Sequence, residues 1–353
     1  MPSASSPLPQ KTGFAGLPKH EGSGGFDHAA AHALSGHVHV AHTANSAVDV
    51  FDPTSRRHLF PVAQLPGVAG VLVSEEAQLI IASNRAENTV AIFSPCPDPE
   101  VSKVAVGVHS NGLAYGHGQR QVLVASVGDP AIPGSHTLSV VSLDDRAMRA
   151  EITVPGRTRW AVHDPDAMAF YLNIADPAQI VVVEARRADR ISRAYPIPSA
   201  GPHGLDLDTH RLFCACDSGV LVTLDARSGR VLGRIPLSGS PDVVTFDRVR
   251  KCLYVAVGDP GTIDMFDTKT MQKLGSCDRN GRAHLCPRTR WRPALRLPPR
   301  GPSGSNLSGR RPHNPGEHLR KTRARRRNDA LAATGRRSTK IPNTNAEQGA
   351  NHA

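Results

Sequence analysis

The sequence has no uninterrupted apolar run of the roughly 18 residues that a membrane-spanning helix needs, so we expect no membrane partner. Its first 20 residues also lack the apolar centre of a signal peptide. We therefore expect a cytoplasmic protein, or a periplasmic one if translation starts at another position.

Signature motifs of common enzyme classes are missing as well. There is no GxSxG nucleophile elbow, no glycine-rich phosphate loop and no HExxH helix. The six cysteines include no CxxC pair, the spacing typical of redox and zinc sites. Cys214 and Cys216 lie two positions apart in an apolar run, which predicts that both are buried on one face of a strand. The sequence identifies neither a catalytic residue nor a cofactor or metal.

Positive charge is unevenly distributed along the chain. The formal net charge is +11, but residues 277–353 hold 18 basic and 4 acidic residues, a net charge of +14. The preceding 276 residues hold 24 basic and 27 acidic residues, a net charge of −3. The structured part is therefore expected to be nearly neutral, without the basic surface that nucleic-acid binding needs.

The first 276 residues contain a repeat. Six segments each combine a short apolar strand, a polar turn and a second alternating strand: 37–52, 79–94, 122–142, 170–185, 212–226 and 253–267. Aligned on Ala41, Ala82, Ala125, Asn173, Ala215 and Ala256, they follow one another at steps of 41, 43, 48, 42 and 41 residues. A constant step of this length is typical of a propeller blade or another repeat unit.

Two further strands lie between successive segments, an outer one such as VLGRIPL (231–237) and an inner one such as HGLDLD (203–208). Four short strands per repeat, with two-residue alternation and no helical period, predict an all-β fold, a β-propeller of four-stranded blades. A β-sandwich with chance similarity between its strands is the alternative, but sandwiches do not repeat at constant spacing.

The segment LYVAVGDPGTIDMFDTKTMQKLG (253–275) resembles the YVTN-type β-propeller repeat. The resemblance covers about residues 14–276 and lacks the Gly-His and Trp-Asp signatures of the WD40 type. It implies the propeller architecture and little about chemistry, because members of that family have varied activities.

The basic tail departs from this pattern where a seventh blade would begin. Read one base out of frame, with four-fold degenerate codons for Arg and Leu, residues 282–299 permit AHTFALAPDGDRLYAFLP, in which the codon of Trp291 forces a glycine. This peptide has the inner strand, Asp-Gly turn and second strand of another blade. We expect a disordered segment (1–13), a propeller of six blades (14–276) and a disordered tail (277–353) produced by a frameshift that removed the seventh blade.

The alternative is an ordinary disordered basic tail, since an Arg- and Pro-rich sequence without apolar periodicity buries no core. In either case KTRARRRN (321–328) is not expected to be a specific nucleic-acid site. It can still bind phosphate non-specifically at low salt.

The innermost strands of a propeller begin at one mouth of its central channel. We name the residues at these starts the mouth positions: Asp27, Ala69, Asn111, Arg159, His203 and Asp242. With their neighbours His28, His109 and Trp160, they predict a ring of mostly polar groups at one height. The candidate ligand-binding residues are Asp27, His28, His109, Asn111, Arg159, His203 and Asp242. The alternative is that polar residues are common in such turns for local hydrogen bonding, and that the channel is simply filled with water.

Two functions follow from this ring. The first is a binding or scaffold propeller that recognises a small ligand, an anion in particular, or a protein partner at the channel mouth. Arg159 favours an anion, because its guanidinium can hold a carboxylate with two hydrogen bonds. The second is a metal-assisted, lactonase-like hydrolase, in which carboxylate, imidazole and amide groups hold a divalent ion.

The other histidines are not expected to form a binding or metal site. His37, His39 and His42 in HVHVAH are predicted to lie on a solvated strand face. His28 and His32 would point to the same side of a strand but about 13 Å apart, too far to share a metal ion.

Overall fold

The computed structural model describes residues 15–259 and 261–278, all of which belong to one unit of the chain, Met1–Leu295. No helix in these two ranges is long and apolar enough to cross a membrane. The expectations for residues 1–13, for residues 279–353 of the tail and for the displaced seventh blade lie outside the described residues. The predicted start of the disordered tail at residue 277 was wrong, because Cys277 and Asp278 end a paired strand, Lys273–Asp278.

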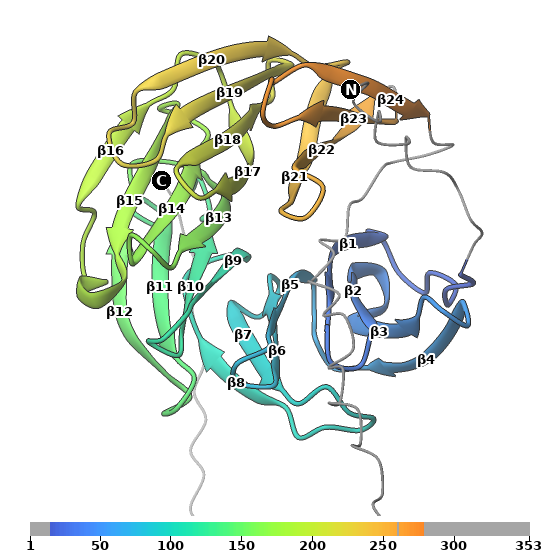
Figure 1. The fold of residues 1–353 in the computed structure, drawn as a ribbon. Coiled ribbons are helices and arrows are strands. Elements are labelled where there is room, and N and C mark those ends of the chain that lie inside the picture. Colours follow the sequence, from blue (N-terminus) through green and yellow to red (C-terminus); the bar gives the residue numbers. More distant parts are fainter. Residues whose placement is uncertain (1–14, 260, 279–353) are drawn as a thin grey trace, which may run out of the picture. The chain divides into compact units, whose positions relative to one another are not determined.

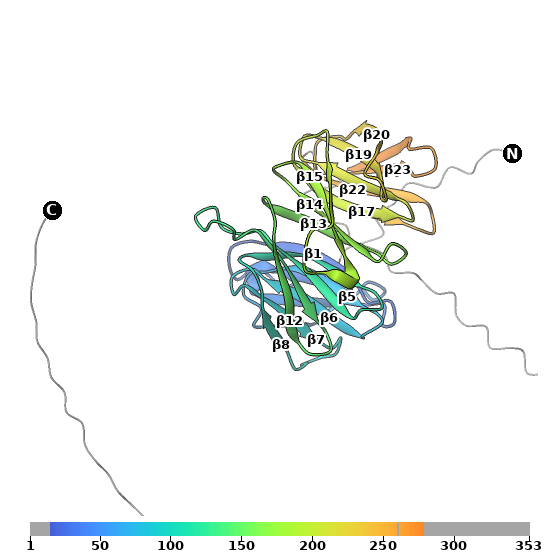
Figure 2. The ribbon, with the colours of Figure 1, turned by 90° about the vertical axis from the view of Figure 1, so that its left-hand side faces the viewer.

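The described residues form six four-stranded antiparallel sheets, which confirms the predicted all-β propeller. Figure 1 shows these blades following one another around a centre in chain order, and Figure 2 shows them from the side. The strands of blades 1 to 3 are β1 (Phe26–Ala31), β2 (Val38–His42), β3 (Ala47–Asp52), β4 (Arg57–Val62); β5 (Val68–Ser74), β6 (Leu79–Asn84), β7 (Thr89–Phe93), β8 (Ser102–Ala105); β9 (Ser110–Gly116), β10 (Gln121–Ser126), β11 (Thr137–Ser142), β12 (Ala147–Thr153).

Blades 4 to 6 continue the same order. Their strands are β13 (Thr158–Asp164), β14 (Ala169–Ile174), β15 (Gln179–Glu184), β16 (Arg193–Pro196); β17 (Pro202–Asp208), β18 (Arg211–Cys216), β19 (Val220–Asp225), β20 (Val231–Pro236); β21 (Ser240–Asp247), β22 (Cys252–Asp259), β23 (Thr262–Asp267), β24 (Lys273–Asp278). Two 3-10 turns, η1 (Thr43–Asn45) and η2 (Ala185–Arg187), complete the regular structure of the described residues.

Aspartates close many of the turns between strands. The side chains of Asp52, Asp164, Asp247 and Asp267 each accept hydrogen bonds from the backbone N–H groups two and three residues further on. Such local bonds let the chain reverse without a partner from elsewhere. They also hold the pKa of the Asp267 carboxyl below its usual range. The repeated Asp at strand ends is therefore part of the turn itself.

Apolar side chains fill the spaces between neighbouring blades. Five clusters each join two successive blades, as in the contact between blades 3 and 4, where Leu123, Leu138, Phe170 and Leu172 are almost wholly buried. Cys214 and Cys216 are fully buried between blades 4 and 5, as predicted. Since one face of each strand meets the preceding blade and the other the following blade, both faces are apolar near the middle of the strand.

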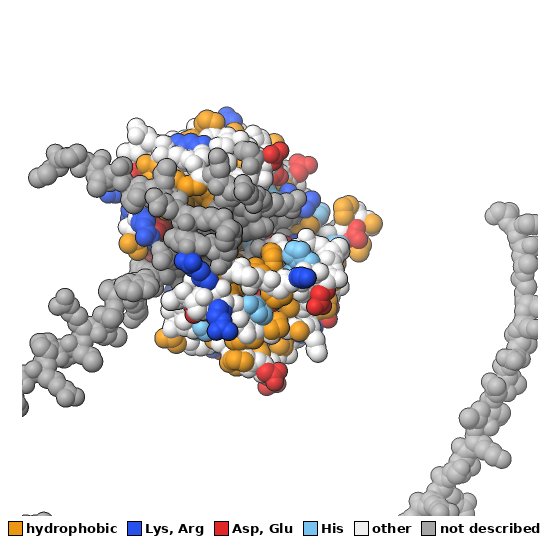
Figure 3. All heavy atoms as spheres, turned by 90° about the vertical axis from the view of Figure 1, so that its right-hand side faces the viewer, with side chains coloured by type: hydrophobic (Ala, Val, Ile, Leu, Met, Phe, Trp, Pro, Cys, Tyr) orange, Lys and Arg blue, Asp and Glu red, His pale blue; other side chains and the backbone are white. Residues whose placement is uncertain are grey.

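The contact between blades 6 and 1 differs from the other five. Each inner strand packs against the next, from β1 to β5 and so on to β21, but among the described residues β21 and β1 make no comparable contact. The far face of blade 6 carries a smaller apolar cluster around Val243, Ala256, Ile263 and Met265. On the side shown in Figure 3, which carries blades 1 and 6, charged side chains of both signs are scattered among apolar and histidine side chains.

The predicted solvated face was wrong for His39 and His42, whereas His37 is half-buried. The side chains of His39 and His42 are 1% and 0% exposed. His39 faces blade 2, whereas His42 faces the opposite side of blade 1 and bonds to Asp49. The alternation of histidine with small apolar residues predicts a polar face turned to solvent. Blade 2 covers the face that carries His39, whereas Asp49, His20 and Phe26 cover the ring of His42.

Candidate functional site

The chain path brings two parts of every blade to the same end of the channel. The inner strand starts there, the second strand returns there, and the turn from the second to the third strand therefore lies beside the mouth positions. A cavity of about 600 Å³ occupies this end. Six of the seven candidate residues line it: Asp27, His28, Asn111, Arg159, His203 and Asp242.

The seventh candidate, His109, lies beside this cavity. It lines a smaller hollow of about 200 Å³ that shares Arg85, Asn111 and Arg157 with the main one. Nδ1 of His109 lies 3.0 Å from the carbonyl oxygen of Gly128, so the ring is fixed by its own blade. The backbone of His109 has a positive φ of 54°, which marks the sharp turn into β9.

Glycines after the mouth positions let the inner strands approach one another. A Cβ on Gly112 would lie 2.6 Å from the carbonyl oxygen of Arg159, and one on Gly204 would lie 2.8 Å from that of Asp242. Gly70 stands in the same relation to Asn111. Because a side chain there would collide with the next backbone, these glycines fix the height of the following mouth position.

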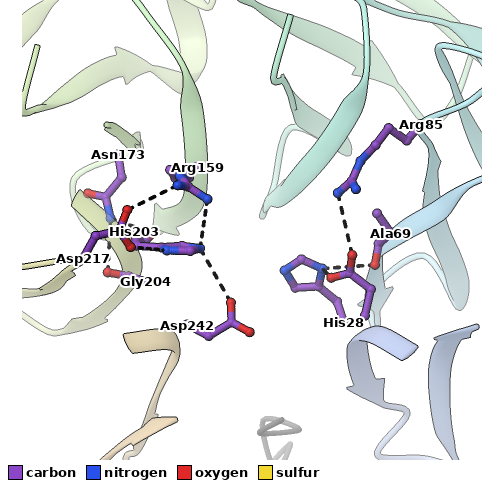
Figure 4. A network of polar contacts seen from close by, with 10 residues as sticks. His28, Ala69, Arg85, Arg159, Asn173, His203, Gly204, Asp217 and Asp242 are labelled. Atoms are coloured by element: carbon purple, nitrogen blue, oxygen red, sulfur yellow. Dashed lines mark hydrogen bonds and ion pairs between the residues drawn. The ribbon is translucent and has the colours of Figure 1, made fainter. Parts of the chain in front are cut away.

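One wall of the cavity is a linked group of four polar side chains, which we call the Arg159 cluster: Arg159, His203, Asp217 and Asp242. Nδ1 of His203 lies 2.7 Å from Oδ1 of Asp217, and Nη1 of Arg159 lies 3.2 Å from Nε2 of His203. Nη2 of Arg159 reaches Asp217 at 3.3 Å, and Oδ1 of Asp242 lies 3.6 Å from Nε2 of His203. Figure 4 shows this group on one side of the cavity.

The Asp217 carboxylate sets the state of the His203 ring. In the neutral ring Nδ1–H donates to Asp217, so Nε2 is an acceptor for the N–H of Arg159. Burial opposes ionisation of Asp217, yet the hydrogen bond and charge of His203, helped by Arg159, hold its pKa below the usual range. Asn173 holds the backbone at His203 in place, because its Nδ2 donates hydrogen bonds to the carbonyl oxygens of His203 and Gly204 at 2.9 and 3.1 Å.

A second group, the His28 cluster, faces the first across the cavity: Asp27, His28 and Arg85. Nδ1 of His28 lies 2.7 Å from Oδ1 of Asp27 and 3.0 Å from the carbonyl oxygen of Ala69, and Arg85 approaches Asp27 at 3.6 Å. Burial alone would lower the pKa of His28, but the hydrogen bond and charge of Asp27 outweigh it and raise this pKa above its ordinary value.

Trp160 lies between the two clusters. Its indole packs edge-on against the His28 ring with the ring centres 4.3 Å apart. Trp160 thereby forms an apolar boundary to an otherwise polar cavity.

Arg157 adds a positive charge that forms no ion pair among the described residues, although its charge helps to lower the pKa of Asp217. It lines the cavity two positions before Arg159, is exposed, and has no carboxylate within ion-pair distance among the described residues. Burial and the charge of Arg157 lower the pKa of the Arg159 guanidinium, which stays a cation at neutral pH. An anion placed between the two arginines would relieve this repulsion.

Four charged residues of the site were not predicted: Arg85, Arg157 and Asp259, which line the cavity, and Asp217, which pairs with His203 behind its wall. Asp217 and Asp259 come from the end of the second strand or the turn after it, a place where the aligned repeats also carry Asp129 and Asp176. Following the antiparallel path through one blade would have found this signal. In the two described ranges, no group of three or more His, Cys, Asp or Glu side chains is arranged to hold a metal ion.

Fold and cavity together define a six-bladed β-propeller with a polar cavity at one channel mouth. No family model and no curated protein sequence matches the chain. Among solved structures it is similar to Kuenenia stuttgartiensis hydrazine synthase, with TM-score 0.61 and 13% identity over 75% of this chain and 81% of that one.

It is also similar to virginiamycin B lyase from Staphylococcus aureus, with TM-score 0.61 and 12% identity over 72% of this chain and 85% of that one. A functionally unknown protein from Desulfotomaculum acetoxidans gives TM-score 0.58 and 10% identity over 66% and 76%. At these identities the likeness shows the fold alone.

Proposed function

We propose that this propeller binds a small anionic molecule, such as a carboxylate, in the mouth cavity. The observation that carries the proposal is the pair Arg157 and Arg159 at the start of β13. Arg159 is held by Asp217 and His203, whereas Arg157 has no carboxylate partner in the described part of the chain. A planar guanidinium in a fixed position suits a carboxylate, which it can hold with two parallel hydrogen bonds.

Unused hydrogen-bonding groups support a polar ligand here. Among the described residues, Nε of Arg85, Oδ1 of Asn111 and Nε of Arg159 are buried and lack a hydrogen-bond partner. All three side chains line the mouth cavity. Since buried polar atoms are nearly always bonded in native proteins, a ligand or ordered water is expected to complete them.

The carboxylates of the cavity narrow the choice of ligand. Asp242 and Asp259 line the same wall as His203. They would repel a second carboxylate but accept hydrogen bonds from hydroxyl groups. A hydroxylated or otherwise hydrogen-donating monocarboxylate therefore fits better than a dicarboxylate. A protein partner presenting one acidic side chain or a terminal carboxylate would use the same groups.

Membership of the YVTN-type repeat family and a cytoplasmic location remain part of this proposal. The repeat period, the antiparallel blades and the segment at 253–275 support the family assignment. The neutral charge of the first 276 residues supports a small-molecule or protein partner rather than nucleic acid.

Hydrolysis is the second candidate, and one observation favours it. His203 is oriented by the Asp217 carboxylate with Nε2 directed away from it, and Nε2 has the arrangement of a general base once a substrate displaces the N–H of Arg159 from it. A metal-assisted lactonase would additionally have to assemble its ligands on substrate binding, because the described residues offer no ready group of three.

Binding to the full-length protein tests the proposal. We expect small hydroxycarboxylates to bind in isothermal titration, and Arg159→Ala and His203→Ala each to weaken the affinity about tenfold or more, since a charge-assisted hydrogen bond contributes about 1.5–3 kcal/mol. A control substitution has to lie outside the cavity and on the surface, which excludes a buried histidine such as His39. Arg149→Ala is the matched control, because Arg149 is exposed on β12 and pairs with Asp145.

If the two cavity substitutions leave every affinity unchanged, the mouth is only a water-filled pore. Turnover of lactones, measured with and without added divalent ions, separates binding from hydrolysis. Turnover that disappears in His203→Ala would favour the hydrolase, and ligand binding without turnover would favour the binding protein.

A further inference from the structure

The channel has a second cavity of about 370 Å³ beyond Trp160. All six inner strands contribute to it, since it is lined by residues of β1, β5, β9, β13, β17 and β21. Residues from the middle to the far ends of these strands, with His117 just after β9, form its wall, whereas their starting residues form the mouth cavity. Trp160 lines both cavities.

The wall of this second cavity is mainly apolar. Ala29, Leu72, Leu113, Val162 and Val243 belong to five different blades and all line it. A water-filled propeller channel needs polar groups to bind its waters, and an apolar wall offers few of them. The cavity is larger than the roughly 150 Å³ pocket that holds benzene in an apolar protein interior.

Four titratable side chains line this wall: Tyr115, whose hydroxyl donates to Glu76, and His117, His163 and Asp206. Burial lowers the pKa of His163 to about 4, so its ring is neutral at pH 7, and neither ring nitrogen has a hydrogen-bond partner among the described residues. Asp206 accepts hydrogen bonds from the backbone N–H groups of Phe246 and Leu207 at 2.6 and 2.7 Å. Burial raises its pKa to about 6.

The two cavities thus differ in chemistry along one axis. The mouth holds two arginines, two linked polar clusters and unpartnered hydrogen-bonding groups, and the interior offers aliphatic side chains. The indole of Trp160 stands at their junction and can contact an apolar group on either side.

We infer that the ligand is amphipathic: a carboxylate bound by Arg157 and Arg159 at the mouth, with an alkyl or aryl body that passes Trp160 into the apolar cavity. This inference rests on the proposed anion site for its head group. It adds the apolar body, which supplies binding free energy in proportion to the area removed from water. A fixed charge at one end and an apolar wall at the other would also set the direction of the ligand.

A series of unbranched carboxylates tests the inference on the full-length protein. Acetate, butanoate, hexanoate and octanoate share one head group and differ only in chain length. We expect the affinity to rise towards fourfold per methylene, the ratio that corresponds to about 0.8 kcal/mol per buried CH₂. The rise should stop once the chain fills the cavity.

Trp160 provides a second readout. The chain has two tryptophans, Trp160 and Trp291, the latter outside the described residues. In a Trp291→Phe background, emission reports on Trp160 alone, and carboxylates long enough to reach the second cavity should change it. Acetate should leave it nearly unchanged.

Two variants separate the head group from the body. Arg159→Ala should weaken every member of the series by a similar factor. Ala29→Phe and Thr245→Phe, each on the wall of the second cavity, should abolish the dependence on chain length while acetate binding stays the same. Two filling variants are used because either one alone could disturb folding, which thermal unfolding without ligand would reveal.

The outcomes distinguish the two proposals. Arg159-dependent binding without dependence on chain length would overturn the amphipathic ligand and leave the anion site standing. A chain-length dependence that survives in both filling variants would also overturn it, since the chain would then bind elsewhere. Affinities unaffected by Arg159→Ala would overturn the anion site itself.

Discussion

Nδ1 of His42 lies 2.7 Å from Oδ2 of Asp49, and both side chains are almost completely buried within blade 1. Two more histidines extend this contact. Nε2 of His58 lies 3.0 Å from the other oxygen of Asp49, and Nδ1 of His20 lies 2.7 Å from Nε2 of His42. The carboxylate thus links β2, β3 and β4 and, through His42, the segment that precedes β1.

Asp49→Ala is therefore expected to destabilise the protein by about 2–4 kcal/mol. The substitution leaves the buried His42 without its acceptor, and breaking a buried polar pair from one side costs far more than the pair contributes net. The change in unfolding free energy is obtained from the midpoint and the slope of a chemical denaturation curve.

Asp144→Ala is the matched control for this prediction. Asp144 also pairs at 2.7 Å, with Nε of Arg120, but the two side chains are 60% and 39% exposed. An exposed pair contributes at most about 1 kcal/mol. Equal effects of the two substitutions would show that burial of Asp49 has no energetic role.

Acid is expected to destabilise the protein through His39. Burial, with smaller contributions from His32 and His37, lowers the His39 pKa to about 4 from its ordinary 6.5. The unfolded chain therefore binds a proton more readily, and stability is lost as pH falls from 6.5 towards 4. The difference between the His39 pKa in the unfolded and in the folded chain corresponds to about 3 kcal/mol of unfolding free energy.

His39→Leu should remove that part of the pH dependence. Nδ1 of His39 has no hydrogen-bond partner among the described residues, so an apolar replacement leaves no new unsatisfied group. We expect the variant to match the parent at pH 7 and to be more stable at pH 4.5, as measured by denaturation at both values. If the unfolding free energies of the parent and the variant changed equally with pH, His39 would not be the source of this pH dependence.

Gly112→Ala should disturb both stability and the mouth cavity. Its Cβ would stand 2.6 Å from the backbone oxygen of Arg159, so β9 and β13 would have to separate. We expect a loss of roughly 1–3 kcal/mol, typical of overpacking, and weaker carboxylate binding because Arg159 moves. Gly233→Ala on the outer strand β20 meets only the side chain of Thr223, at 3.3 Å, and should be nearly neutral.

Read with a one-base displacement from near residue 282, the gene should encode a seventh blade. The expected peptide has the alternation and Asp-Gly turn of the other blades, and it would continue the chain directly after β24. Sequencing the gene from its source tests this, and a protein made in the displaced frame should unfold at a higher temperature. Stop codons early in that frame would rule the idea out.

The fold could be predicted because one pattern recurs six times. A single segment such as 79–94 is compatible with many all-β folds, but its recurrence at about 41–48 residues restricts the choice to stacked or radial repeats. What the pattern could not show was the burial of His39 and His42. Whether a strand face is solvated depends on the blade or segment that packs against it. The alternation of polar and apolar residues along one strand does not show what packs there.

The mouth positions followed from equivalence between repeats, which is why Arg159 and His203 could be named in advance. Their partner Asp217 could not be found from the inner strands alone. It reaches the cavity through the turn from β18 to β19, and its pairing with Nδ1 of His203 depends on side-chain directions that spacing does not determine. The second cavity arises where six inner strands meet, so no single segment predicts it.

Among the described residues, β21 and β1 make a weaker contact than the other successive inner strands, and this affects where the protein is expected to open first. Blades 2 to 5 each have a neighbour on both sides, whereas among the described residues blades 1 and 6 have one each. Within the described residues, the blades are a row of coupled units whose two end blades share no comparable strand contact, and opening is expected to start at these ends and move inward. Hydrogen exchange would then be fastest in blades 1 and 6 and slowest in blades 3 and 4, a gradient that a closed ring of equal units would not show.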